Sequence, residues 1–249
     1  MSGHSKWAQI KRQKGVADAR RGQVFTKLTR EIMLAVREGG PNSESNYQLR
    51  LVIQKAKDSN MPSDNIERAI KRGAGEGEGS SLSEFVLEGY GSSGVAVLIE
   101  ALSDNRNRTV QEVRSILTKH GGSLGEAGCV SWLFDTRGVI TIDATNAASD
   151  DVALMAIDAG AEDVQTDGDY VEVYTEPGLM ADVRKALEQD FHVTSAEVSR
   201  IPKTTVMLDD SKAKQVMGFL DHLDQLDDVQ RVYSNADFAE SAFQGMDQS

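Results

Sequence analysis

Residues 138–201 read GVITIDATNAASDDVALMAIDAGAEDVQTDGDYVEVYTEPGLMADVRKALEQDFHVTSAEVSRI. Four short runs in this stretch are rich in β-branched residues, which is typical of strands, and two longer segments place apolar residues three or four positions apart, which predicts helices. The turn sequence Asp167-Gly168-Asp169 separates the middle two strands. The order β-α-β-β-α-β is that of a ferredoxin-like plait. The expected strands are 139–142, 163–166, 170–174 and 195–201, and the expected helices lie around 152–159 and 179–187.

The segments on either side predict another plait. Before residue 138 the chain predicts two strands, a helix that begins at a Thr109…Glu112 capping box, and a third strand. After residue 201, one helix and one strand supply the α-β ending that the earlier elements lack. We therefore expect a discontinuous first plait, residues 80–135 with 204–236, into which residues 136–203 are inserted as a second plait. The expected elements of the first plait are strands at 84–90, 95–102, 130–134 and 229–233 and helices at 109–120 and around 216–223. Residues 237–249 are expected to form a polar tail.

The first 75 residues differ from the rest because their apolar spacing is helical from Gly22 onward. We expect residues 1–75 to form a basic arm and a small three-helix bundle, followed by a flexible linker, GAGEGEGSS, at 73–81. The predicted fold class is α+β: an N-terminal small helical bundle followed by two ferredoxin-like α-β plait domains, one inserted in the other. The helices are expected from Gly22 to Glu38, after Asn46, and after Pro62, where Ser63 or Asp64 would cap the third.

The charge of the chain is unevenly distributed. Its formal net charge is −12, yet residues 1–72 hold 15 Lys and Arg against 7 Asp and Glu, and residues 73–249 hold 12 against 32. Clustered Lys and Arg neutralise phosphates and release counterions, so a basic module on an acidic body is typical of a protein that meets a polyanion. The alternative is a solvated, charge-rich helical face. The stretch GHSKWAQIKRQK, residues 3–14, favours the polyanion because it combines four Lys and Arg with Trp7 and no acid.

Several function classes are disfavoured. The longest aliphatic run, at 95–99, is far shorter than the roughly 20 residues of a membrane span, and Asp18 comes too early for a transit peptide, so we expect a cytoplasmic protein without membrane contact. The stretch 89–94, GYGSSG, is a literal G-x-G-x-x-G, but a strand follows it instead of a helix, so we read it as a hairpin turn and not as a nucleotide site.

We also expect no catalytic residues, no cofactor, no metal and no small-molecule substrate. The four histidines fall in different elements, and a single Cys makes a structural zinc site improbable. Carboxylates such as Asp221, Asp224, Asp227 and Asp228 are spaced as on a solvated surface. Tyr170 and Tyr174 share a strand face with Glu172, whose charge would repel a phosphate, so base stacking on that sheet is rejected.

The basic arm and the first helix are therefore the candidate nucleic-acid site. Trp7 would stack on a base or pack into a groove, and the cations would contact phosphates. Arg106 and Arg108, placed just before a predicted helix, offer a further phosphate contact, because a helix N-terminus favours anions. A salt bridge to Asp104 explains these two arginines equally well. The candidate phosphate-binding residues of the arm and first helix are Lys6, Lys11, Arg12, Lys14, Arg20, Arg21, Lys27 and Arg30.

Several separate motifs carry a resemblance to a known family. They are Gly3-His4-Ser5-Lys6-Trp7, Arg21-Gly22 with Phe25-Thr26-Lys27, Asn60-Met61-Pro62, Glu88-Gly89-Tyr90-Gly91, and residues 102–109. In this order, over essentially the whole chain, they resemble the YebC/PmpR family. The resemblance implies a cytoplasmic, non-enzymatic protein of three domains, described in bacteria as a probable transcriptional regulator that binds DNA. Relatives include a mitochondrial translational activator, and bacterial members have been linked to ribosomes stalled on proline-rich sequences.

Two nucleic-acid readings stay open. The leading one is a DNA-binding transcriptional regulator, and the alternative is a factor that binds the ribosome, or ribosomal or transfer RNA, and acts on the translation of specific or proline-rich sequences. The sequence holds no recognisable helix-turn-helix, and binding to a structured RNA needs only backbone contacts. The ribosome- or RNA-binding alternative therefore stays open. Two alternatives do not involve nucleic acid. One is a scaffold whose acidic plaits bind a basic protein, and the other is an enzyme with a site near Arg106 and Arg108.

Overall fold

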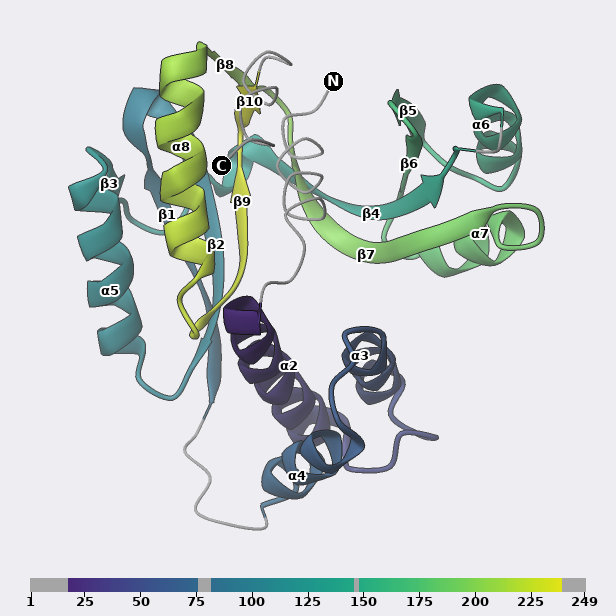
Figure 1. Cartoon of the computed structure of the whole chain (residues 1–249), viewed down its shortest axis with the longest axis horizontal. Coiled ribbons are helices and arrows are strands. Elements are labelled where there is room, and N and C mark those ends of the chain that lie inside the picture. Colours follow the sequence, from purple (N-terminus) through teal and green to yellow (C-terminus); the bar gives the residue numbers. More distant parts are fainter. Residues whose placement is uncertain (1–17, 76–81, 146–147, 239–249) are drawn as a thin grey trace. The chain divides into compact units, whose positions relative to one another are not determined.

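The computed structural model describes residues 18–75, 82–145 and 148–238, which fall into two compact units. One unit is Trp132–Thr205, and the other joins the described parts of Trp7–Ser131 and Val206–Ser249. The predicted fold class is confirmed: the protein is α+β, with a small helical bundle followed by two plaits, one inserted in the other (Figure 1). Among the described residues, no helix is long and apolar enough to cross a membrane.

The bundle consists of α2 (Asp18–Gly39), α3 (Tyr47–Asp58) and α4 (Ser63–Gly73), around a core that includes Ile32, Leu49 and Ile66. The second helix follows Asn46 as expected, and Asn46 caps it: the Asn46 side chain accepts from the Leu49 N–H at 3.0 Å and donates to the Ala35 carbonyl of α2 at 2.7 Å. The expected cap of α4 by Ser63 or Asp64 is wrong. This helix begins directly after Pro62, so both residues already lie in its first turn.

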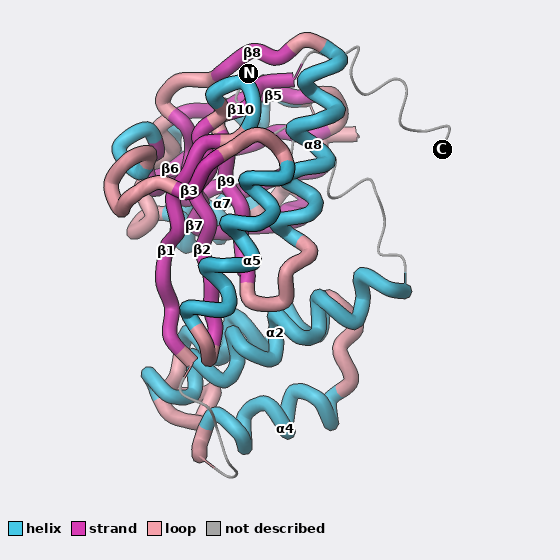
Figure 2. The backbone as a smooth tube through the Cα atoms, turned by 90° about the vertical axis from the view of Figure 1, so that its left-hand side faces the viewer, coloured by secondary structure: helices cyan, strands magenta, loops and turns pink. Residues whose placement is uncertain are grey.

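The first plait has the sheet order β3-β1-β2-β9, and each neighbouring pair is antiparallel. Its core contains Val97 and Ile99 of β2, Leu117 of α5, and Phe219 of α8. Helices α5 and α8 lie side by side on one face of the sheet (Figure 2). The expected hairpin at 89–94 is confirmed, because β1 and β2 pair across it. The elements are β1 (Ser83–Tyr90), β2 (Ala96–Ser103), α5 (Arg106–Lys119), β3 (Ser123–Leu124), α8 (Asp210–Asp224) and β9 (Val229–Ser234).

Two predictions for the elements of the first plait are wrong, and one strand was not predicted. The expected strand 130–134 is absent: Ser131–Leu133 is a 3-10 turn, and Phe134 opens a strand of the second plait. The edge strand next to β1 is instead β3, which was not predicted. A Cβ on Gly122, just before β3, would lie 2.3 Å from the Tyr90 carbonyl oxygen, so a side chain at this position would keep β3 from approaching β1. Helix α5 begins at Arg106 with Asn105 as its cap, one turn before the expected Thr109.

The polar tail expected from residue 237 is also wrong at its start. β10 (Ala236–Phe238) pairs in parallel with β8 (Val206–Leu208), and the Phe238 side chain is fully buried in the core of the first plait. A three-residue strand is too short to show a period of two, which explains why the sequence pattern did not indicate it. Residues 239–249 lie outside the described part of the chain.

The second plait has the sheet order β5-β6-β4-β7, with both helices on one face over a core that includes Ile140, Val173 and Val183. Its first and last strands are neighbours, and Phe134 pairs with Pro202. Just outside this pair the Lys203 N–H donates to the Leu133 carbonyl at 2.8 Å, so the chain enters and leaves the insertion at one place. The elements are β4 (Phe134–Asp143), α6 (Ser149–Asp158), β5 (Asp163–Asp167), β6 (Tyr170–Thr175), α7 (Met180–Leu187) and β7 (His192–Pro202).

Candidate nucleic-acid interface

The outward faces of α3 and α4 carry exposed cations. Helix α4 buries Ile66, Ala69 and Gly73 against the rest of the bundle, so its basic residues face away from the core. Lys57, Lys71 and Arg72 are exposed, and no described acid lies within salt-bridge distance of them. These three residues were not predicted as contacts from the sequence, although the helical period of α4 places its basic residues opposite the apolar stripe.

An exposed aromatic side chain stands at the start of α3. Tyr47 is largely exposed, and the Arg50 guanidinium carbon lies 5.7 Å from the centre of its ring. This distance is within the range of a cation–π contact. An arginine beside an aromatic ring on a basic helix can offer a stacking face and a phosphate contact together. This pair was also missed, because Tyr47 lies at the predicted start of the second helix and does not interrupt its apolar pattern.

The residues proposed for the arm are placed only in part. Lys6, Trp7, Lys11, Arg12 and Lys14 lie outside the described residues. Arg20 belongs to α2, and Arg21 is exposed in the first turn of that helix.

Lys27 and Arg30 face inward, toward the loop that joins α8 to β9. Lys27 Nζ donates to the Asp224 carbonyl at 2.5 Å and lies 3.3 Å from the Asp224 carboxylate. Gln23, one turn earlier, donates to the Gln225 carbonyl at 3.1 Å, so one face of α2 contacts the C-terminal end of α8. Lys27 and Arg30 were expected to extend an outer basic patch along this helix. The geometry favours a different role, because Lys27 already pairs with Asp224 and Arg30 with Asp228 within the same unit.

Asp228 is the centre of this contact and is buried. One carboxylate oxygen lies 2.6 Å from Arg30; the other accepts from Thr109 at 2.6 Å, and from Ser103 and Arg108 at 2.8 Å each. Burial alone would raise the pKa of Asp228, but these hydrogen bonds and the charge of Arg30 outweigh it and lower the pKa. The Asp228 carboxylate therefore stays ionised and joins α2, β2 and α5.

The two arginines before the predicted helix lie instead in the first turn of α5. Arg108 bridges Asp104 at 2.9 Å and Asp228, and the Arg106 guanidinium stacks 5.0 Å from the centre of the Phe85 ring. Of the two alternatives left open for Arg108, the geometry favours the salt bridge to Asp104. The reading of Asp224 and Asp228 as solvated surface carboxylates is wrong, because Asp224 pairs with Lys27 and Asp228 is buried.

His120 and His222 form an unforeseen pair. His120 directly follows α5, and His222 lies in the last turn of α8. His120 Nε2 is 3.0 Å from His222 Nδ1. Burial and the nearby His222 and Lys119 charges lower the pKa of His120. Within the residues that the structure describes, no three His, Cys, Asp or Glu side chains are grouped to hold a metal ion.

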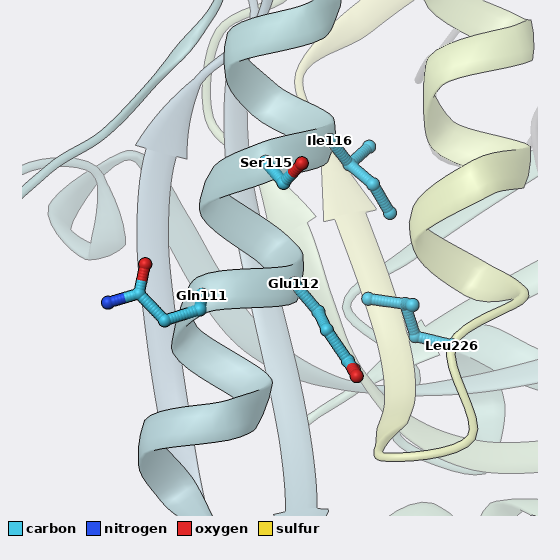
Figure 3. Close-up of a pocket in the computed structure, with 5 residues that line it drawn as sticks. All are labelled: Gln111, Glu112, Ser115, Ile116 and Leu226. Atoms are coloured by element: carbon cyan, nitrogen blue, oxygen red, sulfur yellow. The ribbon is translucent and has the colours of Figure 1, made fainter.

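A shallow depression lies between α5 and Leu226 (Figure 3). It is lined by Gln111, Glu112, Ser115, Ile116 and Leu226.

Fold and charge together define a class of protein, in which a basic helical bundle precedes two acidic plaits on one chain. The chain belongs to the TACO1/YebC family. Residues 5–76 match the model described as the TACO1/YebC protein N-terminal domain, and residues 82–236 match that described as the TACO1/YebC second and third domain. The resemblance drawn from the sequence motifs is thereby confirmed.

Relatives are similar over nearly their whole lengths. One from Dehalococcoides mccartyi, named a probable transcriptional regulatory protein, is 58% identical over 239 residues, covering 96% of this chain and 95% of the relative. One of the same name from Trichlorobacter lovleyi is 51% identical over 247 residues, covering 99% and 100%. The crystal structure of a conserved hypothetical protein from Aquifex aeolicus superposes with a TM-score of 0.82 at 46% identity, covering 91% of this chain and 94% of that one.

Proposed function

We propose that this protein is a non-enzymatic, nucleic-acid-binding regulator of gene expression that acts in the cytoplasm. The observation that carries the proposal is the separation of charge, with a basic module at residues 1–72 and an acidic remainder. Exposed cations without described acidic partners on α3 and α4 agree with this reading. The name of the relatives, probable transcriptional regulatory protein, supports a regulatory role.

In the proposed mechanism, the arm cations and the outer cations of the bundle contact phosphates, while Trp7 and Tyr47 stack on bases. The acidic plaits repel the polyanion and so reduce indiscriminate coating. Lys27 and Arg30 have a different part, because their side chains hold α2 on the α8–β9 loop. They position the bundle instead of contacting phosphate.

Transcription and translation differ in the nucleic acid that is bound. We take DNA as the leading target because of the relatives' name. One observation favours the alternative, a ribosomal or transfer RNA: α4, whose exposed residues include Arg68, Lys71 and Arg72, has only 11 residues and is short for a helix that reads the DNA major groove. Such a surface suits recognition of a phosphate backbone.

Salt dependence of binding tests the proposal. K11A/R12A/K14A should flatten the log–log dependence of affinity on salt by roughly two to three units, since each lost phosphate contact removes about 0.7 to 0.9. K57A/K71A/R72A should act in the same direction if α3 and α4 contribute. The matched control, K185A/K203A/K212A, removes as many positive charges from the plaits and should leave the slope unchanged. Unchanged slopes in both test variants would contradict nucleic-acid binding by this module.

Crosslinking in cells, followed by sequencing of the bound nucleic acid, separates the two targets. Promoter fragments would support the transcriptional reading, and ribosomal or transfer RNA the translational one. Deletion of residues 1–21 addresses the scaffold reading, because full activity of a folded, arm-less chain would favour protein binding over nucleic-acid binding.

A further inference from the structure

Helix α6 of the second plait is apolar on both its inner and its outer face. Val152 and Ala156 are completely buried against the sheet. On the opposite face, Leu154 is 66% exposed and Ile157 is 51% exposed. Residues three apart on a helix are neighbours, so these two side chains form one patch. Because the inner face already supplies the packing, the outer pair adds little to the stability of the plait.

A third apolar side chain extends this patch at the C-terminal end of α6. Leu179, 42% exposed, precedes α7, and its Cδ1 would lie 3.9 Å from a Cβ on Gly160. Gly160 donates its N–H to the Ile157 carbonyl at 3.0 Å, which fixes it next to that residue. Leu179 therefore lies at the end of the helix that carries Leu154 and Ile157, and the three exposed apolar residues are grouped in one region of the plait, unlike the singly scattered apolar residues that are ordinary on proteins.

The rim of this surface is acidic. Asp150 and Asp158 lie one turn before and one turn after Leu154, and both are exposed. Among the described residues, no cation lies within salt-bridge distance of either carboxylate. Helix α6 holds three Asp and no Lys or Arg, and the unit Trp132–Thr205 holds 15 Asp and Glu against 5 Lys and Arg. A partner must therefore be apolar at its centre and basic at its edges.

We propose that this α6 face, defined by Leu154, Ile157, Leu179, Asp150 and Asp158, docks a basic amphipathic helix of a partner protein. The apolar stripe of such a helix covers the three exposed side chains, and its Lys or Arg residues pair with the two carboxylates. Charge complementarity sets the orientation and speeds association, while the buried apolar residues supply most of the affinity. The site lies in the acidic unit and is independent of the proposed nucleic-acid interface.

Titration of the full-length protein with a designed 18-residue helical peptide tests this docking. The peptide carries Leu on one face and Lys on the other, and two further peptides keep its length: one replaces Lys by Glu, and one scrambles the order so that no apolar stripe forms. We expect saturable binding of the Leu/Lys peptide alone, with NMR amide shifts confined to α6 and the start of α7. Equal binding of the Leu/Glu peptide, shifts on another surface, or no binding would overturn the proposal.

Variants distinguish the two parts of the contact. L154Q/I157Q should weaken binding of the Leu/Lys peptide at least tenfold, and D150N/D158N should weaken it less and reduce its salt dependence. M207Q is the matched control, because Met207 is 67% exposed on β8 and belongs to the other unit of the chain. Thermal unfolding of each variant checks that the fold is kept. Unchanged affinity of L154Q/I157Q would overturn the proposal.

A photo-crosslinker at Leu154 in cells then reports the natural occupant. Crosslinks to a basic amphipathic segment of another protein support the proposal. Crosslinks to a second copy of this chain, together with a dimer in sedimentation that L154Q/I157Q abolishes, would replace it by self-association. Both measurements remain informative if nucleic-acid binding by the bundle fails its own test.

Discussion

Asp228 accepts from four side chains that belong to three different elements. Removing one member of such a buried, charge-assisted cluster leaves the others without their partner. We expect Asp228→Asn to lower the free energy of unfolding by about 2–4 kcal/mol, measured by denaturant titration.

Asp227→Asn is the control for this prediction. The Asp227 side chain is exposed, and only its backbone carbonyl accepts from Arg30, so the substitution keeps the contact. A loss below about 0.5 kcal/mol is expected there, as for other surface changes. Equal losses for both variants would show that Asp228 does not hold the cluster together.

His120, whose ring contacts His222, makes stability depend on pH below neutrality. An unfolded histidine takes up its proton near pH 6.5, whereas His120 in the folded chain does so at lower pH. Stability is therefore highest above about pH 7.5, begins to fall as the pH drops to about 6.5, and continues to fall until the pH has passed through the lower pKa of folded His120. We expect the thermal midpoint to fall over this interval, and His120→Asn to flatten the fall.

His192→Gln serves as the comparison in the same pH series. His192 lies exposed at the start of β7, in the other unit, and its replacement should leave the slope as in the parent protein. Identical slopes for the parent and His120→Asn would refute the role given to the pair.

At the scale of elements, Glu88 on β1 orders the loop that follows β3. Its carboxylate accepts from the N–H groups of Gly128, Val130 and Ser131, each at 2.8 Å. Burial raises the pKa of Glu88, but these three hydrogen bonds outweigh it and lower the pKa. In Glu88→Gln, an amide NH₂ faces N–H donors. We expect those three amides to exchange with solvent at least tenfold faster, as followed by NMR hydrogen exchange.

Glu126→Gln is the matched control for the loop, because Glu126 lies in the same loop with an exposed side chain. Its exchange pattern should resemble that of the parent protein. Unaltered exchange in Glu88→Gln would mean that the loop is ordered by its other contacts, such as the Tyr90 hydroxyl on the Cys129 carbonyl.

The elements also show which information is local in the sequence. Long segments with a clear period, such as α2 and β6, were predicted well because their apolar face is fixed by neighbours within a few residues. β3 and β10 are too short to show a period and exist only because distant strands pair with them. The partners of Lys27 and Arg30 were missed for the same reason, since they lie 197 residues away in the chain.

At the scale of the whole molecule, the insertion has its own core and adjacent ends. We expect an isolated fragment of residues 132–205 to fold, with a cooperative thermal transition followed by circular dichroism. A chain in which a Gly-Ser turn replaces residues 135–202 should likewise keep the first plait. A fragment without a cooperative transition would contradict the independence of the insertion, as would a shortened chain that fails to fold.

The adjacency of Leu133 and Lys203 also bears on how the chain is synthesised and folds. β9 must pair with β2, so the first sheet cannot close until nearly all of the protein has been made. Loop-closure entropy grows with the length of the flexible chain between the partners. Once the inserted plait has folded on the nascent chain, its two ends stand side by side, and the whole insertion counts as little more than a turn. Early folding of the insertion therefore removes the delay that its length would otherwise impose on the pairing of β9 with β2.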